Sequence, residues 1–254
     1  MPAPVLVEAC VDSIESALAA AAGGAHRIEL CANLVEGGTT PSAGTLAMCR
    51  MRLGIPIVVL VRPRGGDFLY SAAELGVMLE DIRRVKDAGA HGVVVGVLRA
   101  DGAIDGERTQ QLIAAARPLQ VTFHRAFDVS RDAGEALETL IGLGVERVLT
   151  SGQAATAPQG ADAIARLVRR AAGRIGVLPG GGITAENVEA LVRGTGVAEV
   201  HLTGAVTRRS DMAFRAPQVE IGNAAPRSAY EWSVTDAGQI RRVVESVGEK
   251  KGRL

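Results

Sequence analysis

Short apolar runs rich in β-branched residues alternate along the chain with longer runs whose apolar positions recur every three or four residues. The first pattern predicts strands, and the second predicts helices that bury one face. The predicted strands span residues 5–9, 26–31, 56–62, 91–98, 119–125, 146–150, 174–179 and 197–202. A helical pattern follows each strand, and the last helix is expected at about 236–247.

Eight strands, each followed by a helix, predict a single-domain α/β fold over residues 1–254, the (β/α)8 or TIM barrel. The alternative is an open, doubly wound sheet. No predicted strand is followed by a GxGxxG motif, which weakens the dinucleotide-binding form of that alternative. The polar segment 205–235 departs from a compact barrel, and connections of that length are usually either functional or disordered.

Start signals support several of the predicted helices. Ser71 and Glu74 have the spacing of a capping box. Asp12 and Glu15 resemble one before the first helix, and Thr184 is expected to cap the helix after the seventh strand. These signals place the helix starts just after the strand ends, as a barrel requires.

The alternation within each strand predicts which side chains face the barrel axis. Because the apolar residues must face the surrounding helices, polar residues are left inside. Those near the C-terminal ends of their strands are Glu8, Glu29, Arg62, His124 and His201. Barrel interiors are normally apolar, and a buried charge is costly unless it is paired. Two interpretations stay open: a structural network in which Arg27 and Arg62 satisfy the glutamates, or an active or binding site at the C-terminal mouth.

Charge balance and amino-acid usage argue against several classes of protein. The 28 Lys and Arg residues match the 28 Asp and Glu residues, and the aromatics are four Phe, two Tyr and one Trp, which disfavours nucleic-acid binding. No apolar stretch approaches the ~18 residues of a membrane span. The three lysines, Lys86, Lys250 and Lys251, are poorly placed for Schiff-base chemistry, and no organic cofactor is expected. Three cysteines cannot all pair within one chain, which favours a reducing, cytoplasmic location.

Several motifs resemble those of one protein family. They are IELCANLVEGGTTPS at 28–42, VRPRGGDFLYS at 61–71, TFHRAFD at 122–128, RVLTSGQ at 147–153 and EVH at 199–201. These long, ordered strings resemble the CutC family over about residues 5–205. The resemblance implies a TIM-barrel fold, a cytoplasmic location, self-association, and a link to copper homeostasis and copper binding.

The first functional hypothesis is a cytoplasmic protein that binds or traffics Cu(I). Cys10 and Cys31 each follow an inward-facing glutamate by two residues on adjacent strands, which lie ~4.8 Å apart. Their sulfurs are therefore expected to meet, and two thiolates suit Cu(I) in a linear site. The alternative is that both cysteines are small buried residues that fill the core. Cys49, in the predicted helix 41–53, is expected only to pack.

The second hypothesis is a barrel enzyme that acts on a small anionic or phosphorylated metabolite. Glu8, Glu29, His124 and His201 are its candidate acid–base groups, and His124 is favoured because an imidazole titrates near neutral pH. The candidate anion-binding residues combine guanidinium groups with the glycine loops after strands seven and eight, where barrels commonly bind phosphate. They are Arg62, Arg64, Arg125, Gly180, Gly181, Gly182, Thr203 and Gly204.

The segment 205–235 is rich in arginine and aromatic residues, which are enriched at interfaces. These residues are Arg208, Arg209, Arg215, Arg227, Tyr230 and Trp232. We expect the segment to pack over the barrel rim or on another subunit of a homo-oligomer. The alternative is a mobile surface loop.

Overall fold

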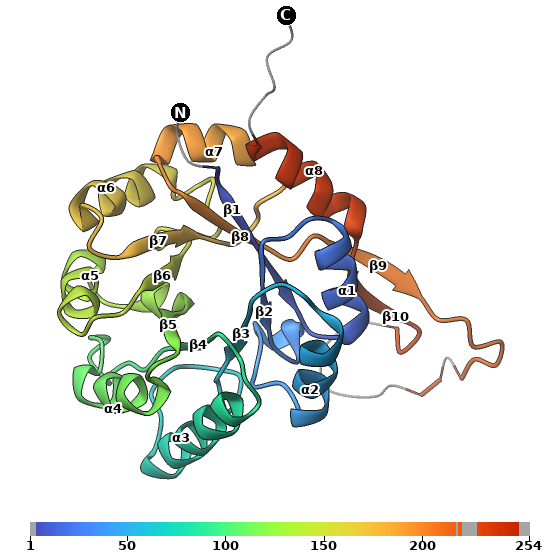
Figure 1. Cartoon of the computed structure of the whole chain (residues 1–254), viewed down its shortest axis with the longest axis horizontal. Coiled ribbons are helices and arrows are strands. Elements are labelled where there is room, and N and C mark those ends of the chain that lie inside the picture. Colours follow the sequence, from blue (N-terminus) through green and yellow to red (C-terminus); the bar gives the residue numbers. More distant parts are fainter. Residues whose placement is uncertain (1–3, 217, 220–227, 249–254) are drawn as a thin grey trace, which may run out of the picture.

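The computed structural model describes residues 4–216, 218–219 and 228–248. Within them, eight parallel strands surround a central axis (Figure 1). They are β1 (Leu6–Val11), β2 (Arg27–Leu30), β3 (Ile57–Leu60), β4 (Gly92–Val95), β5 (Gln120–Phe123), β6 (Arg147–Thr150), β7 (Gly176–Pro179) and β8 (Glu199–Leu202). Neighbours pair in chain order, β8 pairs with β1, and a bridge between Gly180 and His201 closes the ring. The predicted TIM barrel is confirmed.

The helices form an outer ring around the strands (Figure 1). They are α1 (Ile14–Ala22), α2 (Ala43–Arg52), α3 (Ala72–Asp87), α4 (Gly106–Ala116), α5 (Ala133–Gly142), α6 (Ala161–Ala171), α7 (Val188–Thr195) and α8 (Ala237–Val247). Two 3-10 turns, η1 (Leu34–Glu36) and η2 (Arg125–Val129), follow β2 and β5. Among the described helices, none combines the length and apolar character needed to cross a membrane.

The helix starts follow local capping chemistry. Ser71 and Glu74 form the predicted capping box, with the Ser71 hydroxyl accepting the Glu74 N–H and the Glu74 carboxylate accepting the Ser71 N–H. Helix α1 begins after Ser13, whose hydroxyl accepts the N–H of Ser16 at 3.2 Å. The prediction that Asp12 caps this helix is therefore wrong by one residue, because the chain is still extended at Val11.

Strand alternation divides the apolar core into two clusters. The outer cluster lies between strands and helices and includes Val7, Ala9 and Val11 of β1. The inner cluster lies on the other face of the same sheet and consists of Cys10, Cys31, Val58, Leu60 and Val94. Residues from both faces are buried, and the predicted inward direction of Cys10 and Cys31 is confirmed.

Paired charges fill the barrel interior near the starts of the strands. Arg27 donates to Glu8 and to Glu199, the latter at 2.5 Å. The Arg147 Nε donates to both carboxylate oxygens of Glu199 at 3.1 Å. Each carboxylate therefore faces a guanidinium group, which offsets the cost of burying both charges. The structural-network interpretation holds for Glu8 and Arg27.

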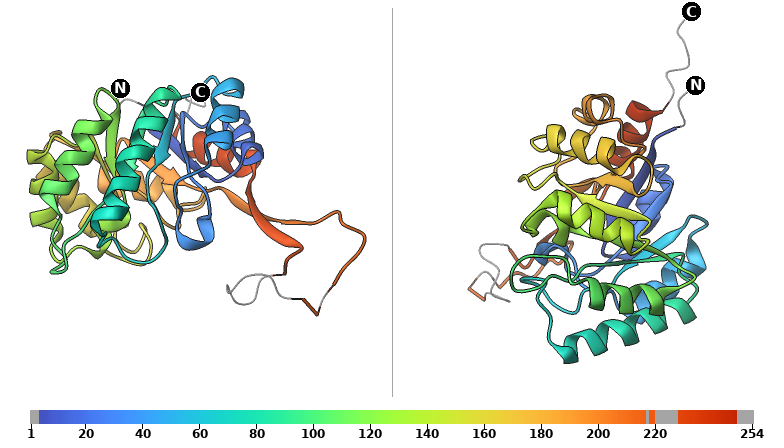
Figure 2. Two further views of the ribbon diagram at one scale, coloured as in Figure 1. Left: turned by 90° about the horizontal axis from the view of Figure 1, so that it is seen from below. Right: turned by 90° about the vertical axis from the view of Figure 1, so that its left-hand side faces the viewer.

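The segment 205–235 contains two strands that the sequence analysis did not predict. Strands β9 (Ala205–Arg209) and β10 (Glu231–Thr235) pair antiparallel in a hairpin that extends away from the barrel, on the side opposite to the N-terminus (Figure 2). Nearly every side chain in them is exposed or half-buried, so neither strand has the clear alternation that predicts a strand. Arg227, Lys250 and Lys251 lie outside the described residues.

Candidate functional site at the barrel mouth

A cavity of about 440 Å³ lies at the C-terminal ends of the strands. Its walls come from the strand ends and the loops that follow them, with a contribution from α8. The predicted site residues that line it are Cys10, Glu29, Arg62, His124, Arg125, Gly181, Gly182, His201, Thr203 and Gly204. The fold therefore brings most of the predicted site residues, from all parts of the chain, to one cavity.

Among the described residues, four predicted ones do not line this cavity: Glu8, Cys31, Arg64 and Gly180. Glu8 contacts His201 and Cys31 contacts Cys10, so both lie directly behind lining residues. The Gly180 N–H donates to the Thr150 carbonyl at 3.0 Å, so it is not free to bind an anion. Arg64 forms ion pairs with Asp67 at 3.0 Å and with Glu74 at 2.5 Å. Its guanidinium group is therefore already neutralised by two carboxylates.

Two free cysteines meet beside the cavity, which Cys10 lines and Cys31 does not. Cys10 lies on β1, and Cys31 follows directly after β2. Their Sγ atoms are 3.8 Å apart, and the Cys31 thiol also lies 3.4 Å from the Val11 carbonyl oxygen. The hydrogen bond to Cys31, together with burial, raises the pKa of the Cys10 thiol. Both sulfurs are free thiols at close range.

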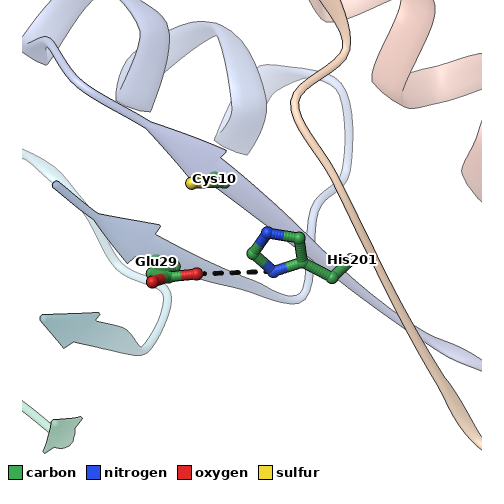
Figure 3. Close-up of side chains that lie close together, drawn as sticks. All are labelled: Cys10, Glu29 and His201. Atoms are coloured by element: carbon green, nitrogen blue, oxygen red, sulfur yellow. Dashed lines mark ion pairs between the residues drawn. The ribbon is translucent and has the colours of Figure 1, made fainter. Parts of the chain in front are cut away.

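His201 and Glu29 lie beside Cys10 (Figure 3). The candidate ligand atoms of these three buried residues all lie within 4.8 Å of one another. The His201 Nδ1 is 2.7 Å from a Glu8 oxygen and 3.5 Å from a Glu29 oxygen. Its Nε2 faces Cys10, so the imidazole bridges the carboxylates and the thiol (Figure 3).

The two inward carboxylates differ in charge state because their partners differ. Burial raises the pKa of Glu8, but His201 and Arg27 outweigh it and hold that pKa at about 2. Burial dominates for Glu29, and its pKa rises to about 7. For His201, burial opposes the charged form, but Cys10, Glu8 and Glu29 together raise its pKa. The group that titrates near neutral pH in this cavity is therefore Glu29.

His124 is held as a neutral imidazole. Its Nδ1 accepts the N–H of Ala126 at 3.1 Å at the start of η2. Burial, and then the charge of Arg62, lower the pKa of His124 to about 3. The expectation that His124 titrates near neutral pH is therefore wrong, and the side chain is a hydrogen-bond donor at pH 7.

Arg62 is buried and anchored by main-chain carbonyls. Its Nη1 donates to the carbonyls of Glu36 and Gly38, both at 2.7 Å, and its Nη2 donates to that of Gly66 at 2.8 Å. The guanidinium carbon lies 5.1 Å from the centre of the Phe68 ring. The side chain thus holds the loops after β2 and β3 together while lining the cavity.

Arg125 lines the cavity and is held in place by two side-chain hydrogen bonds. Its Nε donates to Asp128 at 2.7 Å and its Nη2 to the Ser151 hydroxyl at 2.8 Å. Gly181 lies beside it with φ of +98°, and a Cβ there would meet the Arg125 guanidinium at 3.3 Å. A larger residue at Gly181 would combine backbone strain with a close contact.

The loop after β7 differs from the predicted arrangement. Helix α7 begins at Val188, and its N-cap is Asn187. The Asn187 Oδ1 accepts the N–H of Thr184 at 2.9 Å, which stabilises a turn before the helix. The prediction that Thr184 caps this helix is wrong, because that turn separates it from the helix start.

Some lining residues were not found by sequence reasoning. Phe68 packs between Arg62 and His124, and Gln239 and Val243 of α8 close one side of the cavity. Phe68 lies within the RPRGGDF motif, which was the only available signal for it. The α8 residues follow no motif, and only the closure of the ring brings them to the mouth.

Comparison with known proteins gives consistent matches over most of the chain. The model of the CutC family matches residues 5–206. A copper homeostasis protein cutC homolog from Homo sapiens is 52% identical over 236 residues, which cover 93% of this chain and 86% of that protein. A family protein CutC from Chromobacterium violaceum is 47% identical, with 95% of this chain and 98% of that protein covered.

Solved structures agree with the sequence comparisons. The crystal structure of a copper homeostasis protein CutC from Streptococcus agalactiae has a TM-score of 0.75 at 36% identity and covers 78% of this chain and 98% of that one. The N-(5'-phosphoribosyl)anthranilate isomerase from Pyrococcus furiosus has a TM-score of 0.55 at 14% identity, with 96% and 98% covered. The latter similarity reflects the barrel fold alone.

Proposed function

The chain belongs to the CutC family of copper homeostasis proteins, and we propose that it binds Cu(I) at Cys10 and Cys31 as a cytoplasmic copper-binding or trafficking protein. The observation that carries this proposal is the approach of two free thiols to 3.8 Å beneath a cavity at the barrel mouth. Soft sulfur ligands select Cu(I) over harder divalent ions. Free, buried thiols also suit a reducing compartment.

The sulfur separation favours a bent site over the linear one that the sequence suggested. With metal–sulfur bonds of about 2.3 Å, a linear arrangement needs sulfurs about 4.6 Å apart. At 3.8 Å the same bonds subtend an angle of about 110° at the metal, which leaves room for a third donor. His201 is the candidate, because its Nε2 faces Cys10.

Glu8 is a positioning residue for that third donor. Its carboxylate lies 2.7 Å from the His201 Nδ1, and Arg27 fixes the carboxylate from the other side. A carboxylate on one imidazole nitrogen typically orients the other nitrogen toward a metal and makes it more basic. Cu(I) would displace the protons of both thiols and of His201 on binding.

The proposal is tested by competition between the protein and a Cu(I) chelator under reducing conditions. The wild type should retain about one Cu(I) per chain, and the Cys10→Ser/Cys31→Ser double variant should lose it. Cys49→Ser is the matched control, because Cys49 is buried among the outer core residues and away from the cavity. Equal retention by the double variant and the wild type would rule out this site.

A second function, a barrel enzyme acting on a small anionic or phosphorylated metabolite, is favoured by the size of the cavity. A volume of about 440 Å³ is much larger than a metal ion needs and lies within the range of small-molecule sites. Arg62 and Arg125 line it, together with Gly181 and Gly182 of the loop after β7. Glu29, with its pKa of about 7, is the candidate proton acceptor or donor.

Phosphate stabilisation tests the glycine loop in this second function. Inorganic phosphate should raise the melting temperature of the wild type in proportion to ln(1 + [L]/Kd). Gly181→Ala should remove that shift. Gly196→Ala is the control, because Gly196 has a similar φ of +73°, open space around its Cβ position, and a place at the end of α7. Equal phosphate shifts in the two variants would contradict a role for the loop.

A further inference from the structure

Three side chains of different chemistry meet where β1, β2 and β8 border the cavity. Cys10, Glu29 and His201 all line it, whereas Cys31 does not. One sulfur, one oxygen and one nitrogen atom from these residues lie within 4.8 Å of one another (Figure 3). All three residues are buried, so the cluster is part of the inner wall of the cavity.

The strand register produces this arrangement. Strands β2, β1 and β8 are consecutive neighbours in the ring. Cys10 is the register partner of Glu29 across β1 and β2, and Glu8 is the register partner of His201 across β1 and β8. Because Glu8 and Cys10 are two residues apart on one strand, they share its inner face. The three cavity residues are therefore held by the barrel itself rather than by its loops.

The Glu29 carboxylate is weakly partnered for a group that is only 3% exposed. Among the described residues it accepts no hydrogen bond, and its ion pair with His201 spans 3.5 Å. Glu8, by contrast, is held by His201 at 2.7 Å and by Arg27. Buried carboxylates are normally hydrogen-bonded, paired with a cation or bound to a metal ion. Glu29 lines the cavity, where a metal ion would fill that role.

Two further residues orient the donors from behind. A Glu8 oxygen lies 2.7 Å from the His201 Nδ1, which leaves the Nε2 facing Cys10. A carboxylate on one imidazole nitrogen typically directs the other nitrogen toward a metal. The Cys31 Sγ lies 3.8 Å from the Cys10 Sγ, so the Cys31 thiol can donate to a Cys10 thiolate. Glu8 and Cys31 are therefore positioning residues for this cluster.

The mixed donor set selects the kind of metal. Zn²⁺ takes sulfur, nitrogen and oxygen ligands together, whereas Mg²⁺ and Ca²⁺ take oxygen ligands. Catalytic zinc sites use three protein ligands and keep a fourth position open. Tetrahedral zinc places its donor atoms about 3.3–3.6 Å apart, so closing a cluster that spans 4.8 Å needs a movement of only about 1 Å.

We propose that Cys10, Glu29 and His201 bind a divalent cation, Zn²⁺, with the fourth coordination position open to the cavity. This site goes beyond both functions proposed above and rests on neither. Cu(I) takes the second sulfur of Cys31, whereas Zn²⁺ takes the carboxylate of Glu29. Because both ions use Cys10 and His201, they exclude each other. With Zn²⁺ bound, the Cys10 thiol has lost its proton, and Glu29 is a ligand rather than a proton acceptor.

Competition with a chromophoric zinc chelator, at neutral pH under reducing conditions, tests the site on metal-free protein. The wild type should bind about one Zn²⁺ per chain. Glu29→Gln keeps the shape of the side chain and removes its charge, so Zn²⁺ affinity should fall at least about tenfold. The same variant should hold Cu(I) like the wild type, because it keeps both sulfurs.

Cys31→Ser is the reciprocal control. It removes the second sulfur for Cu(I) but keeps a hydroxyl that can donate to Cys10, so it should lose Cu(I) and retain Zn²⁺. Unchanged Zn²⁺ affinity in a folded Glu29→Gln protein would overturn the proposal, as would a wild type that does not bind Zn²⁺. Equal losses of Zn²⁺ in the two variants would assign the ion to the thiol pair and also overturn it.

The two metal proposals fail in different ways. A wild type that binds Zn²⁺ but not Cu(I) would remove the copper proposal and leave this one in place. A wild type that binds Cu(I) but not Zn²⁺ would do the reverse. Circular dichroism of each variant confirms that a loss of binding is not a loss of fold.

Co²⁺ in place of Zn²⁺ tests the ligands and the open position by absorption. The wild type loaded with Co²⁺ should show a sulfur-to-cobalt charge-transfer band, and Cys10→Ser should lack it. Azide, added as a small anion, should shift the d–d bands by binding at the fourth position. Absence of the charge-transfer band in the wild type would overturn Cys10 as a ligand. Bands that azide leaves unchanged would overturn the open position.

Discussion

Glu8 and Glu29 are both buried inside the barrel, but their partners differ. Strand alternation placed both inside the barrel, and the structure buries both. Alternation could not show that His201 and Arg27 both hydrogen-bond to Glu8, whereas Glu29 makes no ion pair with an arginine among the described residues. That difference separates a pKa of about 2 from one of about 7. Partners depend on strand register and on side-chain reach, and neither is visible in a single sequence.

The low pKa of His124 should make the free energy of unfolding depend on pH. Its pKa of about 3 lies below the unfolded value of about 6.5, so the unfolded chain binds the extra proton first as pH falls. This residue therefore contributes full stability above pH 7, and that contribution is lost as pH falls from about 6.5 toward 3. Between pH 7 and pH 5 the loss should reach about 2 kcal/mol.

Urea unfolding of the wild type and His124→Asn at pH 7 and pH 5 measures this contribution. The difference in unfolding free energy between the two pH values should be smaller in the variant by up to about 2 kcal/mol. Both proteins keep Arg62, whose charge helps to lower the pKa of His124. Identical pH dependence in the two proteins would show that His124 is not held neutral by the fold.

Removing the charge of Glu8 should weaken Cu(I) binding, because Glu8 positions His201. Glu8→Gln removes the charge beside the His201 Nδ1, and Cu(I) affinity should fall about tenfold or more. Glu199→Gln is the matched control, because Glu199 also pairs with Arg27 but forms no ion pair with His201 among the described residues. Chelator competition measures both. Equal losses in the two variants would assign the effect to Arg27 rather than to His201.

At the scale of elements, capping residues were predicted to within a few positions. The capping box at Ser71 is present, whereas α1 begins after Ser13 and α7 after Asn187. Before each of these helices two residues have capping chemistry: Asp12 and Ser13 before α1, and Thr184 and Asn187 before α7. The residue that is used depends on where the extended backbone ends, which the loop geometry determines.

Helix α1 provides a direct comparison of two adjacent residues. Ser13→Ala removes the acceptor of the Ser16 N–H and should lower the free energy of unfolding by about 1 kcal/mol. Asp12→Ala should change it by no more than about 0.5 kcal/mol. Urea unfolding at neutral pH measures both. A larger effect at Asp12 would mean that α1 starts one residue earlier in solution.

At the scale of the whole molecule, the repeating strand–helix pattern predicted the barrel, since each unit carries its own periodicity. The hairpin of β9 and β10 lacked a buried face and was missed. The cavity combines residues from β1 to α8, so its composition became visible only when the ring was closed.

We expect the chain to self-associate through the hairpin region, which comprises β9, β10 and the described residues between them. Exposed apolar side chains gather there, including Phe214 at 75%, Met212 at 59% and Trp232 at 46% exposure. We expect the wild type to form a homo-oligomer through this region, because burying such side chains is favourable. Light scattering should show Phe214→Ser/Trp232→Ser with a lower mass than the wild type. Met51→Ser, on α2 at 78% exposure, is the control.

A monomeric wild type would contradict this prediction, as would equal masses for the hairpin variant and the wild type. A loss of mass in the Met51→Ser control would instead locate the interface at α2.

X-ray absorption at the copper edge tests whether Cys10 and Cys31 bind Cu(I). The protein is loaded with one Cu(I) per chain under reducing conditions. We expect two sulfur neighbours of the copper at about 2.3 Å, from Cys10 and Cys31, and one nitrogen from His201. The sulfur signal should disappear in the Cys10→Ser/Cys31→Ser protein. A wild-type spectrum with only nitrogen and oxygen neighbours would contradict Cu(I) binding at the two cysteines.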